Sequence, residues 1–186
     1  MTNISGNNVG RIAERIVANE LEARGFRVSD LNSDGTSVNA DLLAVSDKLT
    51  LQVQVKGAAN AATDPWWIEY GFCTKEIMRD RNERMFNRKK SFYEASLVVL
   101  VAVRSPKEYS CVVLPVDAAE RLAQLNLDRD YRIPKSDGQD KKPHKVWVAL
   151  EPRTRARAGD ARFAEERSLL ASYRDEQGWE RLLQSN

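Results

Sequence analysis

Apolar residues recur along the chain at two spacings, one typical of helices and one typical of strands. A stripe with helical spacing begins at Val9 and ends at Leu21, and Gly25 follows it as a stop signal, which predicts a first helix over residues 8–24. Alternating or continuously apolar segments come next, separated by turn residues. They predict three strands, with a tight hairpin between the last two, over residues 26–30, 38–46 and 49–56.

The middle of the chain continues this mixture. Residues 66–72 are predicted to form a short extended piece, and a basic helix is predicted from Thr74 to about Lys90. The apolar run over residues 95–104 indicates a strand that is covered on both faces, and residues 110–115 indicate a neighbouring strand. The centre of the molecule is therefore expected to be a sheet.

The last third of the chain begins with a capping pattern, in which Asp117 is followed by Glu120 three residues later. This predicts a helix that continues to about Leu125. The remaining predicted elements are a polar loop over residues 128–143, a strand over residues 145–150 and a final helix over residues 163–183 with Gly178 as a candidate break. This order of elements predicts the α/β class, as a sandwich of helices around a central sheet.

Length and composition indicate one folded domain over residues 1–186, with 42% hydrophobic and 30% charged residues. The apolar run from Leu97 to Val103 is far shorter than the roughly 18 residues that cross a bilayer, and the first residues lack the pattern of an export signal. Cys73 and Cys111 have neither disulfide nor metal-site spacing. We therefore expect a cytoplasmic protein with reduced cysteines and no membrane association.

The formal net charge of +2 is too small to indicate a nucleic-acid partner, but the charge is unevenly distributed. Residues 1–60 carry 6 basic and 7 acidic side chains, whereas residues 75–90 carry 7 basic and 3 acidic ones, a net charge of +4. A charge-rich segment is often only a solvated face. The segment acquires a functional interpretation only if a site for a phosphate-containing substrate lies elsewhere in the chain.

Such a site is suggested by polar residues on the predicted hairpin. Alternation along residues 49–56 places Gln52, Gln54 and Lys56 on one face of the strand, and hairpin pairing brings Asp41 beside Gln54. Glu14 lies on the flank of the first helix, where it can point toward the sheet. Gly10, one turn earlier, is expected to let that helix approach closely.

These residue types suit a hard cation, because Mg²⁺ prefers oxygen ligands and is commonly held by one or two carboxylates. Asp41 and Glu14 would supply negative charge, while the Gln54 amide oxygen and the Val55 backbone carbonyl would add ligands. Lys56 would orient or deprotonate an attacking water. Hydrolysis of a phosphodiester is the reaction that this set favours. A structural role, in which the polar residues only close a hairpin, is the competing interpretation.

The spacing Gly10-x-x-x-Glu14, then Asp41, then Gln54-Val55-Lys56-Gly57 resembles the PD-(D/E)XK nuclease superfamily. The resemblance implies a three-layer α/β/α sandwich with a central mixed sheet, as in restriction endonucleases. Residues 8–115 would form its core and residues 116–186 a C-terminal elaboration. It also implies that Asp41 binds metal, that Lys56 is catalytic and that Gln54 replaces the second acid. Glu14 matches the helix acid of the Mrr-like and Holliday-junction-resolvase-like branches.

The resemblance further implies a Mg²⁺ cofactor with Mn²⁺ as a substitute, a DNA substrate and a homodimer. The basic segment is then expected to contact DNA phosphates through Arg79, Arg81, Arg84, Arg88, Lys89 and Lys90. Glycine motifs for ATP or dinucleotides are absent from the sequence, so no nucleotide cofactor is expected. Because Gln54 is neutral, a catalytically inactive DNA-binding module and an interaction subunit on the same fold remain alternatives.

Overall fold

The structure is a computed structural model, which describes residues 6–31, 40–59, 67–71, 95–105, 107–130, 146–149 and 161–184. Its centre is a five-stranded sheet with the strand order β1-β2-β3-β5-β6. The strands are β1 (Arg27–Asp30), β2 (Leu42–Val45), β3 (Thr50–Ala59), β5 (Leu97–Ser105) and β6 (Glu108–Pro115). Only β3 and β5 pair in parallel, so the sheet is mixed.

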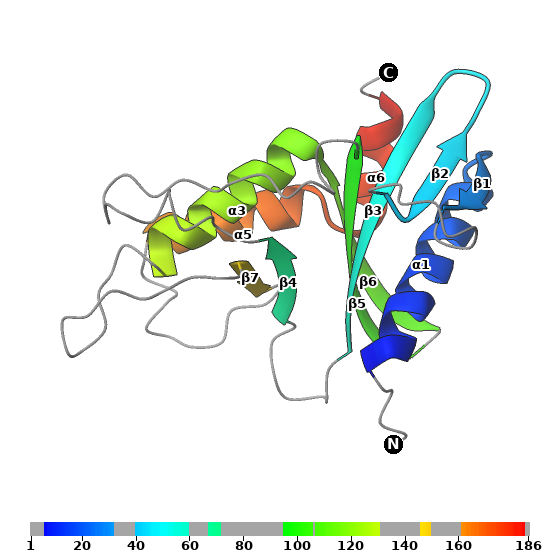
Figure 1. Cartoon of the computed structure of the whole chain (residues 1–186). Helices are drawn as coiled ribbons and strands as arrows, with labels where there is room; N and C mark the ends of the chain where they lie inside the picture. The colour runs from blue at the N-terminus through cyan, green and yellow to red at the C-terminus, as the bar shows by residue number, and fades with distance from the viewer. Residues whose placement is uncertain are drawn as a thin grey trace.

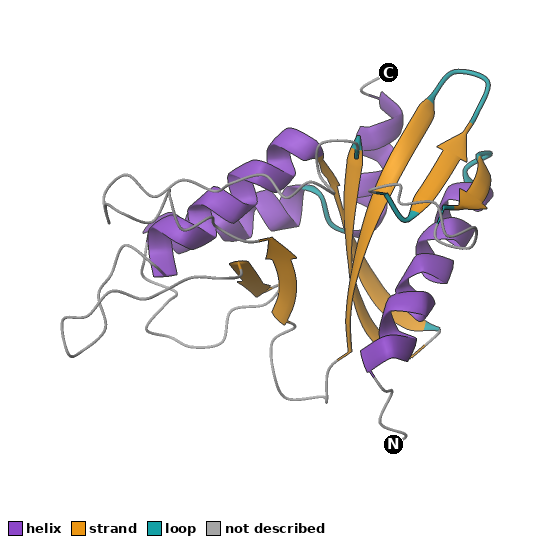
Figure 2. Ribbon diagram, viewed as in Figure 1, coloured by secondary structure: helices purple, strands orange, loops and turns teal. Residues whose placement is uncertain are grey.

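Helices cover both faces of this sheet (Figures 1 and 2). The helices are α1 (Gly6–Ala23), α3 (Val116–Asp130), α5 (Ala161–Ser172) and α6 (Asp175–Gln184). Apolar residues of α1 and α6 form one hydrophobic core with the sheet, and those of α3 and α5 form a second core on the opposite face. The predicted α/β class and the layered arrangement of helix, sheet and helix are therefore confirmed.

β5 is the central element of both cores. Its residues from Leu97 to Val103 are fully buried and alternate between the two faces of the sheet. Because both faces are covered by helices, the strand shows a continuous apolar run instead of alternation. The predicted strand over residues 95–104 is confirmed, and so is its antiparallel neighbour β6.

A second, two-stranded sheet pairs β4 (Trp67–Gly71) with β7 (Val146–Ala149) in antiparallel orientation, with Trp67 opposite Ala149. In space β4 approaches β3, and β7 approaches α3 (Figure 1). The sequence predicts both segments as extended, and the structure confirms them. The predicted basic helix over residues 74–90 lies outside the described residues. The helix predicted to end at about Leu125 continues to Asp130, so the first residues of the loop predicted over 128–143 are helical, and the rest of that loop lies outside the described residues.

The last predicted helix is two helices, and the break lies at Tyr173 and Arg174 instead of Gly178. The chain there crosses the outer edge of β6, so that α5 and α6 lie on opposite faces of the sheet. The Val113 N–H donates to the Tyr173 carbonyl (2.8 Å), and the Cys111 N–H donates to the Asp175 carboxylate (2.8 Å). The crossing segment therefore satisfies edge donors of β6 that would otherwise need water.

Gly178 is buried inside α6, where a Cβ atom would lie 2.1 Å from the Tyr173 carbonyl oxygen and 3.2 Å from the Val113 Cβ. The glycine thus permits close packing of α6 against β6 and does not interrupt the helix. The predicted boundary between a core ending at residue 115 and a later elaboration stays a prediction. None of the helices in the described part of the chain is long and apolar enough to cross a membrane.

Candidate active site

The polar residues of the hairpin meet where β2 separates from β3. The paired register of the two strands ends at Leu42 and Val53, and the Asp41 N–H donates to the Val53 carbonyl (2.9 Å). Beyond this point β3 continues from Gln54 to Ala59. Within the described sheet, this half of β3 pairs with β5 and with no second strand. A fork therefore opens between the start of β2 and the second half of β3, with Asp41 at its base.

The Asp41 carboxylate is held by two donors from β3. Its Oδ2 atom accepts a hydrogen bond from the Val55 N–H (2.7 Å) and another from the Nε2 amide of Gln54. Gln54 is only 3% exposed, whereas Asp41 and Lys56 are partly exposed. The structure thus brings together Asp41 and Gln54, as the hairpin pattern predicts, and it fixes one carboxylate oxygen of Asp41.

The backbone carbonyl of Val55 is directed into the same fork. The N–H and C=O groups of a strand residue point to the same side, and the Val55 N–H points to Asp41. Its side chain packs in the core beneath α1. The position of this carbonyl is compatible with the ligand role that the sequence pattern suggests.

Glu14 reaches the fork from α1, which crosses the sheet on the face of Leu51, Val53 and Val55. The helix approaches β3 closely at Gly57, where a Cβ atom would lie 2.7 Å from the Cβ of Ala13 and 3.1 Å from the Val9 carbonyl oxygen. The expectation that Gly10 permits this approach is wrong, because a Cβ there would meet nothing within 4 Å.

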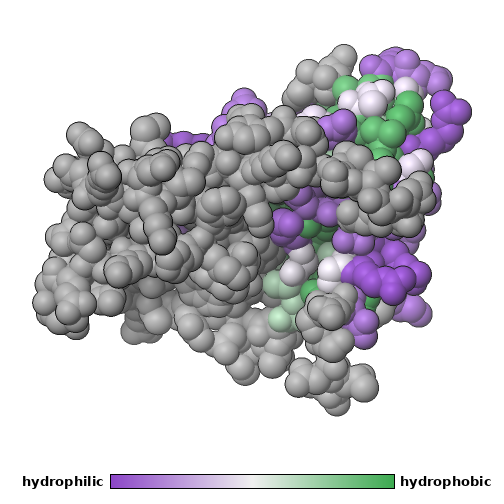
Figure 3. Space-filling view, in the orientation of Figure 1, coloured by the Kyte–Doolittle hydropathy of each residue, from purple (hydrophilic) through white to green (hydrophobic). Residues whose placement is uncertain are grey.

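The outward surface of α1 is hydrophilic (Figure 3), and Arg11 and Arg15 are exposed on it. Glu14, by contrast, is half-buried. Burial raises the pKa of its carboxyl above the ordinary value of 4.5, and the negative charges of Asp41 and Asp30 raise it further. Lys56 and Arg11 lower the same pKa. Glu14 therefore lies in the electrostatic field of Asp41, Lys56 and one further acid.

That further acid, Asp30, is missed by the sequence analysis. It ends β1 opposite Leu42, and the following Leu31 N–H donates to the Asp41 carbonyl (3.0 Å), so the end of β1 lies directly beside the base of the fork. Asp30 is exposed, and its short strand carries no polar alternation that marks it as part of a site. The antiparallel pairing of β1 with β2 was the available signal, because it places the end of β1 beside the start of β2.

The donor set fits a hard divalent cation. It offers two carboxylates, from Glu14 and Asp41, and the Val55 carbonyl as a neutral oxygen, while the Gln54 amide presents its nitrogen to Asp41. Among the described residues, no three His, Cys, Asp or Glu side chains are arranged to hold a metal by themselves, so amide or backbone oxygens would have to complete the set. The Glu14 pKa is raised first by burial and then by the negative charges of Asp41 and Asp30, and a bound cation would offset these two charges.

The residues predicted to contact DNA are not placed by the structure. Arg79, Arg81, Arg84, Arg88, Lys89 and Lys90 all lie outside the described residues.

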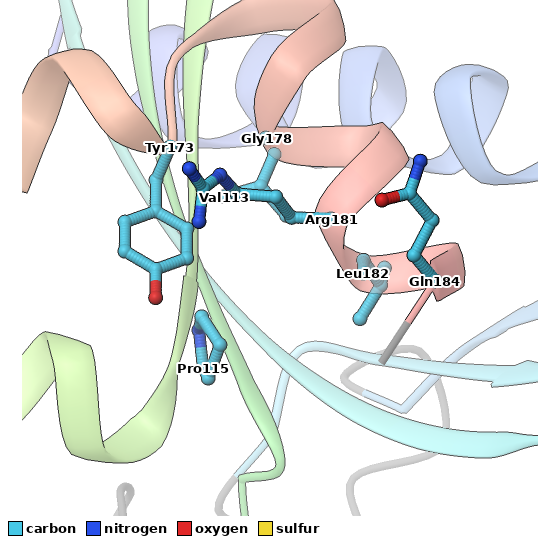
Figure 4. A pocket seen from close by; sticks show the side chains of 7 residues that line it. All are labelled: Val113, Pro115, Tyr173, Gly178, Arg181, Leu182 and Gln184. Atoms are coloured by element: carbon cyan, nitrogen blue, oxygen red, sulfur yellow. The ribbon is translucent and has the colours of Figure 1, made fainter. Parts of the chain in front are cut away.

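A separate cavity of about 210 Å³ lies between β6 and α6 (Figure 4). Its polar lining consists of Tyr173, Arg181 and Gln184, and Val113 and Leu182 contribute apolar surface. The Arg181 guanidinium lies 5.5 Å from the centre of the Tyr173 ring. This lining holds no carboxylate, histidine or thiol. Within the described residues, carboxylates, an amide and a lysine instead converge at the fork.

No protein-family model matches the chain, and no curated protein matches it either. Among solved structures, the chain is similar to a bacterial homing endonuclease, I-Ssp6803I. The sequence identity is 19%, the match covers 97% of this chain and 93% of that chain, and the TM-score is 0.47.

Proposed function

We propose that this protein is a Mg²⁺-dependent DNA endonuclease that hydrolyses phosphodiester bonds at the fork between β2 and β3, with the PD-(D/E)XK arrangement of site residues. The observation that carries the proposal is the Asp41 carboxylate, which is held by the Gln54 amide and the Val55 N–H, together with the electrostatic interactions of Glu14 with Asp41 and Lys56. A carboxylate pair, an amide and an ammonium are the groups that this hydrolysis uses.

Glu14 and Asp41 are proposed to hold the cation, with the Val55 carbonyl as a further ligand. The Gln54 amide oxygen, which the sequence suggests as a ligand, would first have to exchange places with the nitrogen that now donates to Asp41. When bound, Mg²⁺ would supply Lewis-acid stabilisation of the negative charge that develops on the phosphate. Mn²⁺ is expected to substitute, because it also accepts oxygen ligands. In this arrangement the half-buried position of Glu14 strengthens its electrostatic interactions by reducing screening from water.

Lys56 is proposed to act on the substrate side of the site. Its ammonium group can donate hydrogen bonds to a phosphate oxygen and to the attacking water, and so fix the water in line with the scissile bond. Removal of a proton from that water requires the neutral amine, for which Lys56 is a candidate. The basic segment over residues 79–90 is proposed to hold the DNA backbone.

A second candidate function is a DNA-binding module without catalysis. The observation that favours it is the Gln54 amide, which donates to the Asp41 carboxylate and so satisfies with a hydrogen bond an oxygen that a metal would otherwise use. This candidate predicts salt-sensitive DNA binding that EDTA leaves unchanged. The endonuclease predicts cleavage that EDTA abolishes.

The test is a plasmid and branched-DNA cleavage assay with the wild type, Asp41→Asn and Lys56→Ala, each in Mg²⁺, Mn²⁺ and EDTA. We expect metal-dependent nicking by the wild type and at least a roughly 100-fold loss in both variants. Lys48→Ala is the matched control, because Lys48 is an exposed lysine at the tip of the same hairpin. Wild-type activity in Asp41→Asn or Lys56→Ala, with circular dichroism showing intact folding, refutes the proposed site.

A further inference from the structure

Residue 54 stands where the family resemblance expects a second acid, yet this chain has an amide there. The Gln54 side chain is buried at 3% exposure, and its Nε2 donates to Asp41 Oδ2. Gln54 faces away from α1, on the side of the sheet that carries Val98, Leu100 and α3. An ionised carboxylate in this position would be buried against a second carboxylate, which is costly without a compensating charge.

An amide has chemistry that a carboxylate lacks at neutral pH, because it carries a donor and an acceptor on one rigid group. With its nitrogen engaged by Asp41, the Gln54 carbonyl oxygen is turned away from that carboxylate. The Asp41 Oδ2 atom receives two donors, one from a side chain and one from the backbone of Val55. Both donors come from adjacent residues of one strand, so the orientation of the carboxylate is fixed by β3 itself.

We infer that Gln54 is a positioning residue, whose amide fixes the Asp41 carboxylate in its cation-binding orientation before any cation arrives. The inference rests on the proposed function for its metal, but the hydrogen bond itself joins two side chains of the protein and needs no metal to form. A preformed ligand loses less conformational freedom when it binds. The amide therefore takes over, by hydrogen bonding, an ordering role that a second acid could perform only after a cation had neutralised the repulsion.

The contact can be tested by reversing its polarity. In Gln54→Glu, two carboxylates face each other at the base of the fork, and the Asp41 Oδ2 atom loses a donor. In the double variant Asp41→Asn with Gln54→Glu, the new asparagine nitrogen can donate to the new carboxylate. Because Gln54 and the Val55 N–H both donate to Oδ2, an amide nitrogen in that place leaves the Val55 N–H without this acceptor, so the double variant restores one of the two hydrogen bonds. The double variant also keeps the net charge of the wild type.

Thermal unfolding is measured in EDTA for the wild type, both single variants and the double variant. We expect Gln54→Glu to lower the Tm by at least about 4 °C and the double variant to recover part of that loss, because it restores one of the two hydrogen bonds. Gln52→Glu is the control, because Gln52 lies two residues earlier on the same strand and its backbone, not its side chain, pairs with Ser96. Its Tm should stay within about 1 °C of the wild type.

The inferred contact is overturned if Gln54→Glu has the Tm of the wild type. It is also overturned if the double variant is no more stable than the two single changes in Tm, added together, predict.

The second measurement is the rise in Tm with Mn²⁺ alone, without DNA, for the wild type, Gln54→Leu and Gln52→Leu. We expect Gln54→Leu to need at least about 10-fold more Mn²⁺ for half of the wild-type shift, and Gln52→Leu to behave as the wild type.

The two measurements fail in different ways. Equal Mn²⁺ affinity in Gln54→Leu and the wild type overturns the positioning role while leaving the proposed metal site intact. Absence of any Mn²⁺ shift in the wild type refutes the proposed metal site, and the positioning role falls with it. A failed polarity reversal in EDTA counts against the contact between Gln54 and Asp41 alone, whatever the metal does.

Discussion

Gly57 of β3 and Ala13 of α1 are in such close contact that the sheet residue has no room for a side chain, since an added Cβ would lie 2.7 Å from the Ala13 Cβ. Gly57 directly follows Lys56, and Ala13 directly precedes Glu14. One packing contact therefore sets the distance between the helix that carries Glu14 and the strand that carries Gln54 and Lys56.

Gly57→Ala should force α1 away from β3, because Ala13 and the Val9 backbone both occupy the space that the new methyl group needs. We expect a loss of about 1–3 kcal/mol in the free energy of unfolding, measured by urea denaturation. Mn²⁺ affinity should fall as well, because Glu14 moves with the helix. Gly10→Ala is the matched control: it meets nothing within 4 Å and should be neutral or stabilising, by up to about 1 kcal/mol. Equal stability of the two variants would contradict the contact.

Glu14 should make the stability of the metal-free protein fall with pH. Its pKa in the folded chain is raised above 4.5, by burial first and then by Asp41 and Asp30. Between 4.5 and the raised value the folded state binds more protons than the unfolded state, so this group's contribution to stability is lost as pH rises through that window. In EDTA, the Tm of Glu14→Gln should therefore exceed that of the wild type by an amount that grows between pH 4 and 7. A difference that stays constant with pH would exclude this explanation.

Asp30 should contribute negative charge to the cation site, because it is one of the two acids that raise the pKa of Glu14. We expect Asp30→Asn to raise the Mn²⁺ concentration for half of the Tm shift by about two- to five-fold, and the effect should shrink in high salt. The control is Asp47→Asn, since Asp47 is an exposed acid at the far end of the same hairpin. If both variants weaken Mn²⁺ binding equally, net charge and not the position of Asp30 is responsible.

Asp175 should be important for folding because it bonds to the edge of β6 while its own backbone is strained. Its φ of 49° lies in the left-handed region, and its carboxylate accepts from the Ser110 hydroxyl (2.8 Å) and the Cys111 N–H (2.8 Å). Asp175→Ala removes the one oxygen that accepts both hydrogen bonds and keeps the strain, so we expect a loss of about 2–4 kcal/mol in the free energy of unfolding by urea denaturation. Asp175→Asn retains an acceptor and tolerates this φ, and it should lose less.

Cys111 should be unreactive in the folded protein. Burial raises the pKa of its thiol to about 12, and the negative charges of Glu20 and Asp175 contribute in the same direction. At pH 8 the folded protein therefore holds almost no thiolate at this position. In a Cys73→Ser background, iodoacetamide should modify Cys111 only on addition of urea, as measured by intact mass. Rapid modification of the native protein would contradict the burial of this strand.

The order of strands and helices could be predicted from sequence because each element carries a local signal. The continuous apolar run of β5 and the hairpin pattern of β2 and β3 each identify an element without knowledge of the others. The position of the break between α5 and α6 could not be predicted in this way. It depends on the Val113 N–H and the Asp175 side chain meeting across the edge of β6, which is a contact between distant parts of the chain.

The residues of the candidate site likewise divide into those that a local sequence pattern identifies and those that depend on contacts between distant parts of the chain. Asp41 and Gln54 were expected together because hairpin pairing is local, and the structure places them in contact. Asp30 and the role of Gly57 were missed, because both depend on how β1 and α1 approach the hairpin in space. The sequence identified Gln54 as a candidate metal ligand through its amide oxygen. Only the structure shows that the amide nitrogen is the group directed at Asp41.

The segment from Tyr173 to Asp175 also affects whether a truncated chain would self-associate. An exposed strand edge is a template on which another chain can add a strand. In the full chain this segment covers the edge of β6 at Cys111 and Val113, so that edge does not recruit a second molecule there. A chain that terminates before Tyr173 would still contain every residue of the fork, yet it would expose that edge beside the apolar run from Leu97 to Val103 in β5. Premature truncation would then produce self-association and clearance by proteolysis, even though the site residues are all present.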